Sequence, residues 1–143
     1  MDIWFDYNIP KDSIVIEVSE DKVKGGLSDV LDKIVELKNN GFHIAIDNYG
    51  AKYADLFLFS EVKFDTLKLD RELVHKLETD EKTCMISKSV IDICKNYNIS
   101  VVAEGVENEK EYDILKEMGC DEAQGYLFDK PMSWNRLKKI FVI

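Results

Sequence analysis

Five short runs rich in β-branched and aromatic residues alternate with amphipathic helical patterns along this chain of 143 residues. The runs begin near residues 14, 43, 66, 99 and 123, so successive starts lie 23 to 33 residues apart. Each interval has room for one helix and its loops, and strands that are joined through a helix run parallel. The sequence therefore predicts an α/β fold with about five mostly parallel strands.

The expected strands cover residues 13–18, 42–47, 66–70, 99–104 and 123–128. Helical periodicity lies between them, over 27–37, around 53–59, over 73–77 and from about 80 to 97. Thr79 or Asp80 is the expected cap of that long helix. A capping box of Asn108 and Glu111 opens the next helix, and Ser133 is the expected cap of a last one.

Charge and cysteine content exclude several classes of protein. The 19 Lys and Arg against 28 Asp and Glu give a net charge of −9, which argues against a nucleic-acid partner. No apolar run is long enough to cross a membrane, so no membrane partner is expected. The 3 cysteines include no CxxC pair, so we expect reduced thiols and a cytoplasmic protein.

Polar side chains gather where the expected strands end. Ligands of parallel βα folds bind at the C-terminal ends of the strands, so these residues are expected to share one site. Grouped carboxylates need a cation, and oxygen ligands suit Mg²⁺ or Mn²⁺. We therefore predict a divalent-metal site of Glu17, Asp47 and Glu104 with Lys68 as the cation among them, suited to phosphate-ester hydrolysis. The other polar residues at these ends are Glu20, Asn48, Asp70, Glu107 and Gln124.

The sequence motifs at the strand ends resemble those of a known family. VIEVSE, AIDNYG, DTLKLDREL, VVAEGVEN and QGYLFDKP occur in that order, and AEGVE followed by QGYLF is the most specific piece. From about Ile9 to its end, the chain resembles the C-terminal part of EAL domains, the cyclic di-GMP phosphodiesterases. This resemblance implies a TIM-like barrel that linearises cyclic di-GMP to pGpG with two Mg²⁺ or Mn²⁺ ions.

The resemblance also implies roles for individual residues. Glu17, Asp47 and Glu104 match metal ligands or their close neighbours, and Asn48 stands where a second metal-binding Asp is usual. Lys68 matches the lysine that holds the catalytic water or the phosphate, and Glu104 also matches a proposed general base. Glu20 matches the glutamate that steadies the loop after the second strand. The remaining matches, to supporting site residues, are Asp70, Glu107 and Gln124.

Several features of the family do not occur in this sequence. The E-A-L tripeptide is absent, and so are the substrate-binding Arg that follows it and a metal-binding Asn of a later strand. Asn48 removes one anion, which is expected to weaken the second metal. We expect the isolated chain to be inactive. The alternative is a non-catalytic module that dimerises, binds a partner or binds cyclic di-GMP.

The expected architecture is a partial TIM-like barrel that lacks its first part. We take residues 1–143 as a single domain with a leader segment at 1–8. Five strands of an eight-stranded barrel leave two open edges, which invite association. The edges are expected to be covered by the chain's own N-terminal segment, by a second copy in a homodimer or a partner chain, or by the rest of a longer protein.

Overall fold

The computed structural model describes residues 9–20, 28–51, 56 and 58–141, and the leader predicted at 1–8 lies outside them. The strands are β1 (Val15–Ser19), β2 (His43–Tyr49), β3 (Thr66–Leu69), β4 (Ser100–Ala103) and β5 (Glu122–Ala123). A 3₁₀ turn, η1 (Lys11–Ser13), precedes β1. The helices are α3 (Ser28–Asn39), α4 (Leu58–Glu61), α5 (Arg71–Lys76), α6 (Glu81–Asn96), α7 (Glu109–Met118) and α8 (Trp134–Phe141).

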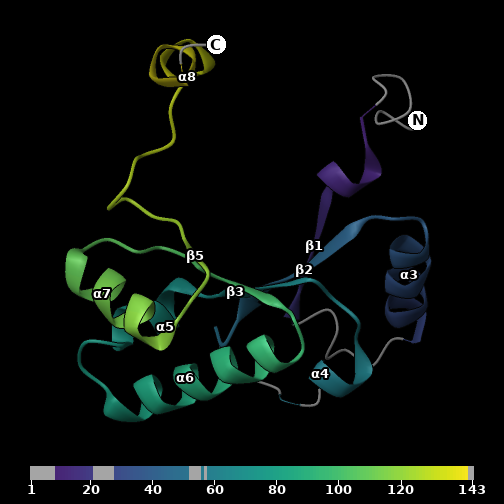
Figure 1. Ribbon diagram of the computed structural model, residues 1–143, viewed down its shortest axis with the longest axis horizontal. Coiled ribbons are helices and arrows are strands. Elements are labelled where there is room, and N and C mark those ends of the chain that lie inside the picture. Colours follow the sequence, from purple (N-terminus) through teal and green to yellow (C-terminus); the bar gives the residue numbers. More distant parts are fainter. Residues whose placement is uncertain (1–8, 21–27, 52–55, 57, 142–143) are drawn as a thin grey trace.

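The five strands form one parallel sheet in chain order, β1-β2-β3-β4-β5. This confirms the prediction of a partial TIM-like α/β fold. Within the described residues the sheet is not closed, and β1 and β5 are its edges. In the view of Figure 1, α4, α5, α6 and α7 lie below the sheet, whereas α8 stands apart above it at the end of an extended segment.

The two faces of the sheet differ because side chains alternate along each strand. Leu67 and Leu69 of β3 and Val101 of β4 are fully buried on the face that packs against the helices. The helix α6 contributes Ile91 to the same core, together with its neighbours Val90 and Cys94. The opposite face of β3 carries Lys68, so the polar site lies on the side of the sheet that these helices leave uncovered.

Two aspartates fix the sheet at the end away from the site. The side chain of Asp65 accepts a hydrogen bond from Ile44 N–H at 2.8 Å, and it pairs with Lys38 of α3. Asp121 accepts from Val101 N–H, also at 2.8 Å. In both cases an aspartate just before one strand satisfies a backbone donor of the previous strand, which helps to set the parallel register.

The fifth strand is shorter than predicted. Residues 123–128 were expected to form it, but β5 ends at Ala123 and the chain then turns. Gly125 packs against the backbone of Val106, and Leu127 N–H donates to Val106 O at 3.0 Å. These bonds to the loop after β4 replace the ladder that a longer strand would need, so the apolar residues of 126–128 belong to a turn.

The helix ends follow the expected capping residues. Asp80, rather than Thr79, caps α6 by accepting from Lys82 N–H. Asn108 caps α7 and accepts from the two N–H groups of the first turn, while Gly119 ends it at a φ of 78°. The helix α8 begins directly after Ser133. No helix in the described part of the chain is both long and apolar enough to span a lipid bilayer.

Candidate active site at the carboxyl ends of the strands

Lys68 lies at the centre of a cluster of three carboxylates. Its Nζ is 2.8 Å from Glu17 Oε1, 3.2 Å from Asp47 Oδ1 and 2.8 Å from Glu104 Oε1. The four groups come from β1, β2, β3 and the residue after β4, so the parallel register of neighbouring strands brings them together. The four residues that the sequence placed at a common site are therefore in contact.

The lysine is held in its charged form. Its side chain is only 13% exposed, and burial alone would lower its pKa. Its close contacts with the carboxylates of Glu104, Glu17 and Asp47 outweigh that effect and raise the pKa of Lys68 well above its ordinary range. Three carboxylates and one ammonium leave a formal charge of minus two in the cluster.

Asp47 and Asn48 lie where β2 departs from regular pairing. The register with β3 shifts between Ile46 and Tyr49, as in a β-bulge. Asn48 has a φ of 58°, in the left-handed region that Asn tolerates better than most residues, and it is exposed. Its Nδ2 donates to Asp47 Oδ2 at 2.8 Å, which orients the carboxylate beside Lys68.

Glu104 is fixed by residues of β3 and of the segment after β5. Its N–H donates to Leu69 O at 3.0 Å, which extends the pairing of β3 and β4. The Nε2 of Gln124 donates to Glu104 Oε1 at 2.7 Å. Lys68 uses the same oxygen, so among the described contacts Oε2 of Glu104 is left to bind a proton or a cation.

The other three residues predicted for the site lie beside it, beyond the ends of β1, β3 and β4. Glu20 is 3% exposed and accepts from Gly50 N–H at 3.2 Å, in the loop after β2. Asp70 caps α5 by accepting from the N–H of residue 72. Glu107 lies beyond the end of β4 with an exposed side chain. These carboxylates do not contact Lys68 in the described structure.

Sequence reasoning missed a second polar cluster behind the loop after β4. The buried side chain of Glu111 accepts from Glu107 N–H at 2.8 Å through Oε2, and its Oε1 is 2.8 Å from Nδ1 of His75 in α5. The capping-box pattern of Asn108 and Glu111 predicted a local bond, but Glu111 reaches one residue further back and across to α5. Burial would raise the pKa of Glu111, but the bonds from Glu107 N–H and His75 lower it.

The carboxylate oxygens of this cluster are the type of ligand that a hard divalent cation prefers. Within the described residues, however, no group of three His, Cys, Asp or Glu side chains is arranged to hold a metal ion without other ligands. Lys68 lies between the carboxylates, which explains why they do not converge on a single point. Asp47 Oδ1 is buried and makes no hydrogen bond with good geometry to Lys68 or any other group in the described part of the chain. A buried oxygen of this kind is a suitable ligand for Mg²⁺ or Mn²⁺.

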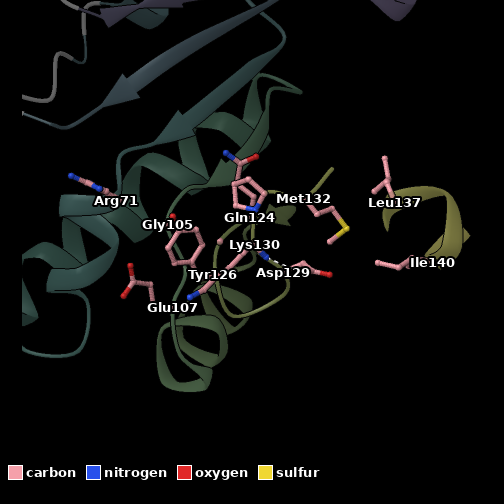
Figure 2. A pocket seen from close by; sticks show the side chains of 12 residues that line it. Arg71, Gly105, Glu107, Gln124, Tyr126, Asp129, Lys130, Met132, Leu137 and Ile140 are labelled. Carbon is pink, nitrogen blue, oxygen red and sulfur yellow. Dashed lines mark hydrogen bonds between the residues drawn. The ribbon is translucent and has the colours of Figure 1, made fainter. Parts of the chain in front are cut away.

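A cavity of about 690 Å³ adjoins the cluster. Figure 2 shows Gln124 and Tyr126 on one side of it, with Leu137 and Ile140 of α8 facing Met132 across the open space. Gln124 therefore links the two, because it lines the cavity and also donates a hydrogen bond to Glu104 of the cluster. The volume is in the range of sites for small organic ligands.

The cysteines lie outside the site. Burial raises the pKa of the Cys94 thiol to about 12 and that of Cys120 to about 11, so both stay protonated at neutral pH. All three, including Cys84, are free thiols.

Comparisons with known proteins agree with this architecture. The EAL domain family model matches residues 2–131. The cyclic di-GMP phosphodiesterase RocR of Pseudomonas aeruginosa is 35% identical over 127 residues, which are 89% of this chain and 32% of RocR. The chain thus spans about a third of the length of this relative.

Solved structures show the same fold. The EAL domain of Mycobacterium smegmatis DcpA superposes with a TM-score of 0.87 at 31% identity, over 98% of this chain and 63% of the DcpA chain. Klebsiella pneumoniae BlrP1, in a complex with calcium and cyclic di-GMP, also has a TM-score of 0.87, at 34% identity over 92% of this chain and 33% of its own. The ordered motifs, the five parallel strands and the matched family model together show that this chain belongs to the EAL domain family.

Proposed function

We propose that this chain carries the lysine and several cation ligands of a site that hydrolyses cyclic di-GMP to pGpG, and that the isolated chain does not complete the reaction. The observation that carries the proposal is the contact of one largely buried ammonium, 13% exposed, with carboxylates from three other strands or strand ends. A net charge of minus two in the cluster suits one divalent cation, and such an ion attracts a phosphodiester.

Glu17, Asp47, Asn48 and Glu104 are the residues proposed to hold Mg²⁺ or Mn²⁺. BlrP1 has been solved as calcium and manganese complexes with cyclic di-GMP, which supports a divalent ion for this family. Such an ion, when bound, lowers the pKa of a coordinated water and offsets charge on the phosphate. Asn48 supplies one neutral amide in place of a carboxylate, so it contributes less to the binding of a second ion.

The chain's own residues would position and deprotonate the water. Lys68 keeps its proton, so its ammonium can hold a phosphate oxygen or the attacking water but cannot act as a base. Glu104 is the candidate base, because its Oε2 is left open while Gln124 and Lys68 hold Oε1. Glu20, Asp70 and Glu107 are proposed to keep the surrounding loops in place.

The isolated chain is proposed to be inactive because the first part of the family's site is not in this sequence. The E-A-L glutamate and the Arg and Asn that accompany it have no counterpart. Loss of several ligands at once leaves the transition state without much of its electrostatic stabilisation.

The cavity beside Gln124 favours a second candidate, a module that binds cyclic di-GMP without cleaving it. The free thiols support a reducing compartment such as the cytoplasm.

The test is incubation of the purified chain with cyclic di-GMP and Mn²⁺, with pGpG measured by chromatography and ligand binding by calorimetry. We expect no pGpG above the background without protein. Turnover that Glu104→Gln abolishes, while the exposed Glu109→Gln retains it, would overturn the proposal of inactivity. Binding of cyclic di-GMP without turnover would favour the binding module. If Mn²⁺ raises Tm and Asp47→Asn removes the effect, the proposed cation ligands are supported.

A further inference from the structure

His75 of α5 lies between two carboxylates of the segment that follows β4. Its Nδ1 is 2.8 Å from Oε1 of Glu111, and its Nε2 is 3.9 Å from Oε1 of Glu107. The other oxygen of Glu111 accepts a hydrogen bond from the N–H of Glu107 at 2.8 Å. Glu107 is therefore held through its backbone by Glu111, while its side chain lies opposite the second ring nitrogen of His75.

The pairing with Glu111 fixes which ring nitrogen of His75 carries the proton. Burial would raise the pKa of Glu111, but the bonds from Glu107 N–H and His75 lower it, so this carboxyl is ionised at neutral pH and only accepts. Nδ1 of the neutral imidazole is therefore the donor, and Nε2 keeps its lone pair. The distance of 3.9 Å from Nε2 to Glu107 agrees with this assignment, because it is too long for a hydrogen bond.

A second proton on His75 goes to Nε2, because Nδ1 already carries one. Histidine is the side chain that ordinarily changes its charge between about pH 5 and 8. The imidazolium donates from both nitrogens, so Nε2 becomes a charged donor opposite the carboxylate of Glu107. His75 is 39% and Glu107 57% exposed, so the two side chains have room to move toward each other.

These two carboxylates are the acidic groups that pair with the imidazole among the described residues. Helix α6 also packs against α5, but none of its acidic side chains in the described structure lies within 4.0 Å of His75. The remaining charged groups of α5 and of the first turn of α7 are Arg71, Glu72, Lys76, Glu109 and Lys110. Since Glu111 is already bound through Nδ1, the new contact that a second proton creates is the one with Glu107.

The side chain of Glu107 also lines the cavity beside the candidate site. Arg71, one helical turn before His75 on α5, is another of the lining residues. The loop lies close on α5, because a Cβ at Gly105 would be 2.5 Å from Cβ of Arg71, and its φ of 70° suits glycine. Figure 2 shows Arg71, Gly105 and Glu107 on the side of the cavity away from α8. The carboxylate of Glu107 thus has two places, the cavity wall and the ring of His75.

We propose that His75 is a positioning residue which, when it takes up its second proton, draws the carboxylate of Glu107 from the cavity wall onto α5. Protonation then neutralises one negative charge of the lining, so an anionic ligand binds more tightly at about pH 6 than at about pH 8. The inference about His75 rests on the geometry of its ring. Its consequence for cyclic di-GMP rests on the proposed function.

The first experiment follows the side-chain carboxyl carbon of Glu107 by NMR in the full chain from about pH 5 to 8. We expect its signal to shift in a step near neutral pH, well above the pH of about 4 at which a glutamate itself titrates. His75→Asn keeps a donor toward Glu111 but takes up no proton, so it is expected to remove the step. Lys76→Asn, an exposed change on the same helix, is expected to retain it.

The same titration also tests the proposal without a variant. The step of Glu107 is expected to have the same midpoint pH as the imidazole signal of His75, and this comparison decides the matter if His75→Asn does not fold. Absence of a step, different midpoints, or a step that persists in folded His75→Asn would overturn the proposal.

The second experiment measures binding of cyclic di-GMP by calorimetry at about pH 6 and about pH 8. The native chain is expected to bind about threefold or more tightly at the lower pH, because one carboxylate no longer repels the phosphates. Glu107→Gln lacks that carboxylate and is expected to bind equally at both pH values, and an unchanged pH difference in this variant would refute the role of Glu107. If cyclic di-GMP does not bind at either pH, the proposed function loses support, while the NMR titration still decides the role of His75.

Discussion

Replacing Glu111 tests whether the polar cluster behind the loop after β4 stabilises the fold. Glu111→Ala removes a side chain that is 3% exposed and leaves two donors, Glu107 N–H and His75 Nδ1, without their acceptor. A carboxylate only accepts, so Nδ1 of His75 is the donor in this pair. The expected loss of stability is the cost of the two unpaired donors plus the cost of losing one buried methylene.

The structure sets the size of this loss. The unpaired backbone N–H costs about 1–2 kcal/mol, and the imidazole costs less because His75 is 39% exposed and water can replace the carboxylate. The one methylene that is lost, Cγ of Glu111, adds about 1 kcal/mol together with the space that the side chain leaves. We expect a total near 3 kcal/mol, which lowers Tm by roughly 10 °C in a domain of this size.

Urea unfolding followed by circular dichroism at neutral pH measures the effect. Glu109→Ala, an exposed change on the same helix, is the matched control and is expected to cost under about 0.5 kcal/mol. Glu111→Gln keeps the methylenes and one acceptor, so its cost is expected to fall between the two. If Glu111→Ala unfolds at the same urea concentration as Glu109→Ala, the cluster does not contribute to stability.

The same cluster predicts a pH dependence. The pKa of Glu111 is lower in the folded chain than the roughly 4.3 of an unfolded one, because the bonds from Glu107 N–H and His75 outweigh the effect of burial. A group whose pKa is lower in the folded state than in the unfolded state stabilises the fold fully at pH values above its unfolded pKa. It loses this contribution to stability as the pH falls through its folded pKa. The difference in stability between the native chain and Glu111→Gln should therefore be full at pH 7 and shrink below about pH 4.

Three other changes have definite expected outcomes. Lys68→Met leaves three carboxylates without their ammonium, so we expect the free energy of unfolding without metal to fall by about 2 kcal/mol. Mn²⁺ is expected to raise the Tm of this variant more than that of the native chain. Equal rises of Tm would contradict the charge of minus two assigned to the cluster. Gly125→Ala brings a Cβ to 2.1 Å from Val106 O and is expected to cost about 3 kcal/mol or more by thermal unfolding, against about 1 for Gly41→Ala, where no atom lies within 4 Å. Asp65→Asn weakens the pair with the α3 lysine and is expected to cost about 1 kcal/mol at pH 7. Because the pKa of Asp65 is lowered in the folded chain, this cost is expected to shrink as the pH falls below about 4.

The sheet could be predicted because its signals are local and repeated. Each strand is short, rich in β-branched residues and followed by a helical period, so strand order and direction follow from connection rules alone. The meeting of Glu17, Asp47, Lys68 and Glu104 follows from the same rule, because parallel strands carry their C-terminal ends to one edge. Neither result required knowledge of side-chain contacts.

The features that were missed depend on contacts between segments far apart in the sequence. Residues 126–128 look like strand because they are apolar, but the close approach of Gly125 to Val106 turns the chain before them. His75 gave no signal because its partner, Glu111, lies 36 residues away and its own neighbours are those of an ordinary surface helix. The bulge at Asn48 is likewise a property of the pairing with β3 and not of the local sequence.

The position of Lys68 explains how an open sheet can hold its carboxylates together. Carboxylates gathered around one point repel each other, and without a cation between them the three side chains would separate or take up protons. The ammonium of Lys68 lies within 3.2 Å of all three and stays charged, so this chain's own residues assemble the cluster without a bound ion. A bound divalent cation and Lys68 would then both have to contact the same carboxylates.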